Sequence, residues 1–133
     1  MPEVLVIDDN PTQLSVREAV LRDAGFSVKG VASAEAARDW LADEASSRQL
    51  GVIVTDHVLP GASGAAFARS LRDSRPAVRV FVVTGMDEAE PEYSGLGVTF
   101  LRKPCPPEEL ISKVREALDG EALIQSSRTR RRV

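Results

Sequence analysis

Five side chains that could do chemistry lie at, or just after, the ends of short apolar runs. Asp8 and Asp9 follow the first run, Asp56 ends the third, Thr84 ends the fourth and Lys103 follows the fifth. Three carboxylates in one crevice would raise one another's pKa unless a divalent cation and an ammonium group neutralised them. Mg²⁺ suits a site of few carboxylates, water and a phosphate. These residue types therefore indicate magnesium and phosphate chemistry, provided that the run ends meet in space.

Each of these residues also has an ordinary structural explanation. The run Asp8-Asp9-Asn10-Pro11 could be only a turn and a helix cap. Asp56 could cap the next segment, threonine is common in strands, and Lys103 could be a solvated surface charge. The chemical interpretation depends on all of them standing at strand ends together.

Five strands and their connecting segments would have to position these residues. Short apolar runs rich in β-branched or aromatic residues are typical of buried strands. The predicted strands are Val4 to Ile7, Phe26 to Val31, Val52 to Thr55, Val78 to Val83 and Val98 to Leu101. Nearly continuous apolar runs favour a parallel sheet covered on both faces. Alternating strands and helices with right-handed crossovers predict a doubly wound α/β sandwich, whose ligands bind at the carboxyl ends of the strands.

Capping and breaking residues mark the predicted helices. Predicted starts lie at Asn10-Pro11, Ser33, Ser63-Gly64 and Pro106-Pro107, and predicted ends at Gly25, before Pro76 and at Gly120. The first start is the clearest, because Asn10, Pro11 and Gln13 suit the cap, the first helical position and a capping box. The segment 86–95 contains Pro91 and four acidic residues, so we expect a shortened fourth helix there.

Length and charge describe one acidic domain. The chain has 133 residues, of which 43% are hydrophobic and 28% charged, which suits a single core. Four of its arginines lie in the last six residues, and the preceding 127 residues hold 13 basic and 20 acidic side chains, a formal charge of −7. An acidic body argues against a nucleic-acid-binding domain. We predict a domain over residues 1–119 and a basic tail over 120–133, either a helix extension or disordered.

Other features of the sequence limit the setting and the chemistry. Cys105 is the single cysteine, which excludes an internal disulfide and a multi-cysteine metal site. No apolar run approaches the roughly 20 residues of a membrane helix, and no signal-peptide pattern is present, so we expect a cytoplasmic protein. His57 has no second histidine to complete a metal site, and packing or surface exposure is the better interpretation.

Four motifs in order along the chain carry a family resemblance. They are Val4-Leu5-Val6-Ile7-Asp8-Asp9-Asn10, Asp56-His57-Val58-Leu59-Pro60-Gly61 with Gly64, Val82-Val83-Thr84-Gly85 and Phe100-Leu101-Arg102-Lys103-Pro104. With them, residues 3 to about 119 resemble the receiver domain of two-component response regulators, of the chemotaxis-regulator type. The resemblance implies a flavodoxin-like fold, (βα)5, with a five-stranded parallel sheet.

The resemblance also implies roles for the clustered residues. Asp56 would accept a phosphoryl group from the phosphohistidine of a histidine kinase or phosphotransfer protein. Asp9 would bind Mg²⁺ directly and Asp8 largely through water, while Asp56 and the backbone carbonyl of Val58 would complete the metal ligands. Lys103 would supply positive charge to the phosphoryl oxygens, which suits a transfer stabilised mainly by positioning and cations.

Two further residues would report the phosphorylation. Thr84 would donate its hydroxyl to a phosphoryl oxygen, and Phe100 would be the switch aromatic that moves inward, although an aromatic residue on a half-buried strand is equally well explained as core. The Lys103-Pro104 bond is predicted to be cis. The sequence departs from the family pattern in two places. The stretch from Thr84 to Lys103 is about one helical turn short, and the residues two beyond Asp56 and two beyond Thr84 are both apolar, Val58 and Met86.

The sequence thus predicts a switch phosphorylated on Asp56, and no enzyme. A receiver-fold interaction module that works without phosphorylation, and a receiver excised from a hybrid histidine kinase, remain alternatives. An aspartyl-phosphate phosphatase would need a second acid two residues after its nucleophile, where this chain has Val58. In the family, the positions of Val58 and Met86 flank the path of the water that hydrolyses the acyl phosphate. Both side chains are apolar here and cannot orient that water, so we expect slow loss of the acyl phosphate.

Overall fold

The computed structural model describes residues 2–59, 62–85 and 97–131. At its centre is a sheet with the strand order β2-β1-β3-β6-β7, and every pairing in it is parallel. Its strands are β1 (Val4–Ile7), β2 (Val28–Val31), β3 (Val52–Asp56), β6 (Arg79–Thr84) and β7 (Thr99–Arg102). All five predicted strands are confirmed, with ends that differ by two residues at most.

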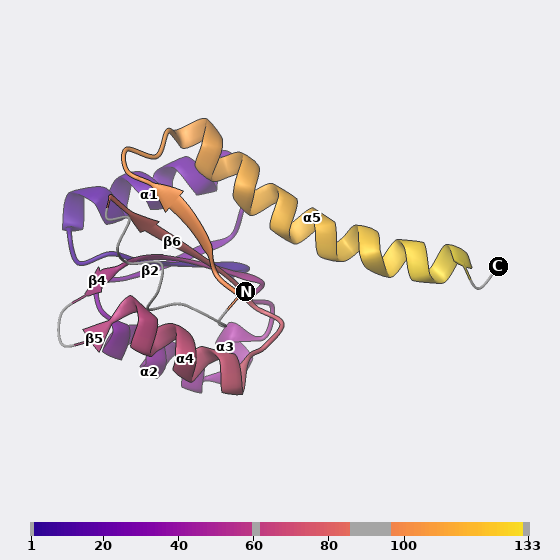
Figure 1. Cartoon of the computed structure of the whole chain (residues 1–133), viewed down its shortest axis with the longest axis horizontal. Helices are drawn as coiled ribbons and strands as arrows, with labels where there is room; N and C mark the ends of the chain where they lie inside the picture. The colour runs from indigo at the N-terminus through magenta and orange to yellow at the C-terminus, as the bar shows by residue number, and fades with distance from the viewer. Residues whose placement is uncertain (1, 60–61, 86–96, 132–133) are drawn as a thin grey trace.

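Helices cover both faces of this sheet. α1 (Pro11–Asp23) and α5 (Pro107–Arg131) lie on one face, and α2 (Ala34–Ala42) and α4 (Gly64–Ser74) lie on the other (Figure 1). Leu21 of α1 and Val114 of α5 pack in the core on the first face. Ala37 of α2 and Phe67 of α4 pack in the core on the second. Burial on both faces explains why the strand runs are continuously apolar. The predicted doubly wound, flavodoxin-like α/β fold is confirmed.

Helix α1 begins where its capping residues predict. The Asn10 side chain accepts a hydrogen bond of 3.0 Å from the backbone N–H of Gln13, and Pro11 opens the helix. After the helix, Gly25 has φ +102°, a conformation that side chains rarely adopt. The short loop that carries Asp8 and Asp9 is therefore held between the end of β1 and a fixed helix start.

The last helix does not end where the sequence predicted. Gly120 predicts a stop, but α5 continues to Arg131 and projects beyond the sheet (Figure 1). A glycine inside a helix costs only about 1 kcal/mol relative to alanine, and the following Glu121, Ala122 and Leu123 include good helix formers. Of the two alternatives for the tail, the helix extension is therefore observed. The predicted short fourth helix, residues 86–95, lies outside the described residues.

Arg115 connects α5 to the segment that follows α1. Its guanidinium donates a hydrogen bond of 3.0 Å to the carbonyl of Ala24 and lies 5.4 Å from the centre of the Phe26 ring. Neither α5 nor any other helix in the described ranges is long and apolar enough to cross a membrane.

Two short features were not predicted. One is the single turn α3 (Glu44–Ser47), and the other is the hairpin of β4 (Val58–Leu59) and β5 (Ala62–Ser63), which follows Asp56. Both are too short to give a periodic pattern.

Candidate functional site

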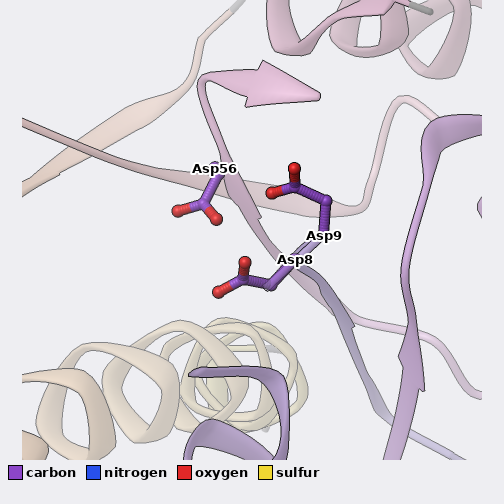
Figure 2. A group of neighbouring side chains, drawn as sticks. All are labelled: Asp8, Asp9 and Asp56. Carbon is purple, nitrogen blue, oxygen red and sulfur yellow. The ribbon is translucent and has the colours of Figure 1, made fainter. Parts of the chain in front are cut away.

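The three predicted carboxylates come together at the carboxyl ends of two neighbouring strands. Asp8 and Asp9 follow β1, and Asp56 ends β3, which pairs with β1 along its length. One carboxylate oxygen from each residue lies within 4.8 Å of the other two, and Figure 2 shows the three side chains together. Asp8 and Asp56 are buried and Asp9 is exposed. The strand order changes direction between β1 and β3, and ligands of doubly wound sheets bind at this point.

The carboxylates line a pocket of about 350 Å³. Its lining also includes Asn10, Gln13, His57, Val83, Thr84, Gly85 and Lys103. The pocket thus brings two further predicted site residues, Thr84 and Lys103, next to the acids. Phe100 is not in this lining, and its partly buried ring packs against the core on the α2 and α4 face.

Lys103 reaches the pocket from the end of β7. Its ammonium lies 3.2 Å from Oδ1 of Asp56, and its backbone N–H donates to the carbonyl of Thr84 at 3.1 Å. The Lys103-Pro104 bond is cis, as predicted. The end of the sheet therefore positions Lys103 so that its positive charge lies beside the buried carboxylate of Asp56.

The sequence did not identify Arg17 as part of the site. This residue lies in the second turn of α1, and its Nη1 donates to Oδ2 of Asp8 at 2.9 Å and to Oδ1 of Asp56 at 3.3 Å. Its side chain is only 14% exposed. One signal in the sequence could have found it. The N-cap Asn10 directly follows the acidic pair, and Arg17 lies two helical turns after Asn10, so that it faces back toward the acids. The first turn of this helix holds no acid that could pair with Arg17 instead.

The environment of Asp8 makes its carboxylate costly to ionise. Burial, followed by the neighbouring Asp56, raises the pKa of Asp8 to about 6, against the lowering effect of the Asn10 N–H and the Arg17 guanidinium. The Asn10 N–H donates to Oδ1 of Asp8 at 2.9 Å. A cation placed here would favour the charged form.

This donor set fits Mg²⁺. The pocket offers hard carboxylate oxygens close together and no sulfur or imidazole among the three residues that could ligate. Val58 lies in β4, two residues beyond Asp56 and outside the five-stranded sheet. Its carbonyl as a metal ligand stays a prediction.

The remaining candidates take structural positions. Packing or surface exposure was predicted for His57, and the residue is buried, which favours packing. Cys105 is partly buried against the core on the α1 and α5 face. Met86 lies outside the described residues.

Known sequences resemble the chain over most of its length. Residues 4–115 match a family model described as the response regulator receiver domain. The transcriptional regulatory protein AruR of Pseudomonas aeruginosa is 31% identical over 122 residues, which are 89% of this chain and 50% of AruR. The hydrogenase transcriptional regulatory protein HoxA of Cupriavidus necator is 31% identical over 124 residues, 90% of this chain and 25% of HoxA. The chain thus spans about half and a quarter of the length of these relatives.

Solved structures resemble it as well. A CheY-like response regulator receiver domain protein from Methanospirillum hungatei superposes with a TM-score of 0.82 at 23% identity, over 92% of this chain and 97% of that one. The BeF3-activated DrrB receiver domain gives a TM-score of 0.74 at 30% identity, over 90% and 98% of the two chains.

Proposed function

Because the chain belongs to the response regulator receiver domain family, a family of phosphorylation-dependent signalling modules, we propose that it is a switch phosphorylated on Asp56. One observation carries the proposal. Asp56 lies in one pocket at the strand ends together with Lys103 and with the two acids that follow β1. The phosphodonor we propose is the phosphohistidine of a histidine kinase or phosphotransfer protein.

The transfer uses Asp56 as the nucleophile. A carboxylate oxygen of Asp56 forms the new P–O bond while the P–N bond of the phosphohistidine breaks, and the electron pair leaves with the imidazole nitrogen. Negative charge stays on the phosphoryl oxygens throughout, so positioned cations stabilise the transition state more than bond-making groups do. Lys103, whose ammonium contacts Asp56 already, supplies one such charge.

Asp8, Asp9, Asp56 and the carbonyl of Val58 would hold Mg²⁺. The metal would neutralise the phosphoryl oxygens and the acids around them. Asp8 is fully buried and Asp9 is exposed. An exposed carboxylate can rearrange to bind a cation directly, which supports the direct role proposed for Asp9.

The readout of the signal passes through Thr84 and Phe100 in this proposal. Thr84 ends β6 and lines the pocket. Phe100 lies on the adjoining strand β7, where it pairs with Val82 of β6. Movement of the Thr84 hydroxyl toward a phosphoryl oxygen would vacate space near β7 for an aromatic ring. We place the receiver at residues 1–119 and treat residues 120–133 as a tail, although α5 runs through that boundary without a break.

Intact mass after treatment with acetyl phosphate tests the proposal. With Mg²⁺ the wild-type protein should gain one phosphoryl group, and without Mg²⁺ the labelling should fall sharply. Asp56→Asn should gain none, whereas Asp39→Asn, at an exposed acid on α2, should be labelled like the wild type. Labelling that persists in Asp56→Asn would remove the assignment. A wild type that never labels would favour an interaction module working without phosphate.

A further inference from the structure

Arg17 contacts two of the three pocket acids. A single nitrogen, Nη1, donates to both Asp8 and Asp56, the two buried carboxylates. Arg17 and Lys103 both contact Asp56, and Arg17 is the more enclosed of these two, with a side chain 14% exposed against 41% for Lys103. Arg17 is thus an enclosed partner of the two buried acids, although it is not among the residues that line the pocket.

The charge count shows what this arginine changes. Three carboxylates face two cations among the described side chains that touch them, which leaves the pocket with one net negative charge. Without Arg17 the same pocket would carry two. Arginine stays protonated at any pH at which the protein is folded, so this charge cannot be removed by titration.

The guanidinium already occupies carboxylate oxygens that a divalent cation in this pocket could use. Arg17 occupies Oδ2 of Asp8, while the other oxygen of Asp8 already accepts the N–H of Asn10. It also touches Oδ1 of Asp56, the oxygen that faces Lys103. A cation that approaches Asp8, directly or through water, must therefore break or share the Arg17 ion pair.

We propose that Arg17 is a tethered counter-ion that competes with Mg²⁺ for Asp8 and Asp56, and so raises the Mg²⁺ concentration that the site requires. This inference rests on the metal site of the proposed function. In the metal-free protein the guanidinium neutralises two buried carboxylates that would otherwise repel each other. When the metal binds, the guanidinium leaves Asp8 and becomes more accessible.

Calorimetric titration with Mg²⁺ near pH 8 tests the competition directly. Arg17→Gln should bind Mg²⁺ about tenfold more tightly than the wild type, since roughly the free energy of one partly enclosed ion pair no longer opposes binding. Arg17→Lys keeps the charge and should stay within about threefold of the wild type. Lys113→Gln is the matched control, because it removes one positive charge from an exposed pair with Glu116 on α5, and it should bind as the wild type does.

The outcomes separate this inference from the proposed function. If wild type and Arg17→Gln bind Mg²⁺ equally well, the competition is absent while the metal site stands. If neither binds Mg²⁺, the metal site itself is wrong. An Arg17→Lys protein that binds as tightly as Arg17→Gln would also overturn the counter-ion role.

A second measurement uses the wild-type protein alone, in case Arg17→Gln fails to fold. Phenylglyoxal modifies accessible guanidinium groups, and peptide mapping by mass spectrometry gives the rate at each arginine. Saturating Mg²⁺ should speed the modification of Arg17 several-fold and leave Arg48, an exposed residue, unchanged. An Arg17 rate that does not respond to Mg²⁺ contradicts the displacement.

Discussion

Arg75 should be one of the most costly surface-facing side chains to remove. It lies just beyond α4 and is half-buried. Its guanidinium donates to the carbonyls of Ser47 at 2.8 Å and Leu41 at 3.0 Å, and its Nη2 lies 2.6 Å from Oγ of Ser47. These acceptors stand at the ends of α2 and α3, where helix carbonyls lack intrahelical partners. One side chain therefore joins three helices on the same face of the sheet.

The expected cost follows from these contacts. A hydrogen bond from a charged donor contributes about 1.5–3 kcal/mol, but three bonds from one guanidinium share its ordering and solvation and do not add fully. Arg75→Ala should therefore lower the free energy of unfolding by about 2–4 kcal/mol. Arg75→Lys, with a single ammonium, should recover only part of this loss.

Urea unfolding followed by circular dichroism measures this change. The midpoint should fall while the slope with denaturant stays the same, which identifies a loss of stability rather than a change in the unfolded chain. Arg48→Ala, at an exposed arginine next to Ser47, is the control and should change stability by less than about 0.5 kcal/mol. An Arg75→Ala protein as stable as this control would refute the reasoning.

Four other outcomes are expected. Asp9→Ala should weaken Mg²⁺ binding in calorimetry, and unchanged affinity would remove its role as ligand. Burial and then the Glu109 carboxylate raise the pKa of the Cys105 thiol, so Glu109→Gln should lower that pKa and speed alkylation near pH 8, where more thiolate would form. Truncation after Gly120 should leave the melting temperature nearly unchanged, and a large drop would reveal a docked tail. Val58→Asn should shorten the lifetime of the acyl phosphate measured by intact mass; an equal lifetime would contradict the apolar-path explanation.

The sheet could be predicted because its strands are buried on both faces. Val52, Ile53 and Val54 are all fully buried, so the run is apolar without interruption, and the parallel order places its last residue, Asp56, beside the end of β1. Local patterning therefore located the acids, the threonine and the lysine together.

The positions of Arg17 and Arg75 could not be predicted in the same way. Each contacts residues far away in sequence, across 39 positions from Arg17 to Asp56 and 34 from Arg75 to Leu41. Spacing along the chain does not identify the distant partner of either arginine, and arginine side chains are ordinarily solvated. The stop predicted at Gly120 failed for the opposite reason, because a local signal was weaker than the helix formers around it.

The length of α5 makes it a lever. Its 25 residues give a rigid rod about 38 Å long, which starts four residues after the lysine that touches Asp56. A tilt of only about 5° at the first turn would displace the last turn by about 3 Å. Any tilt of its first turn would therefore move the far end of the helix much more than the near end, with no change in the fold of the sheet.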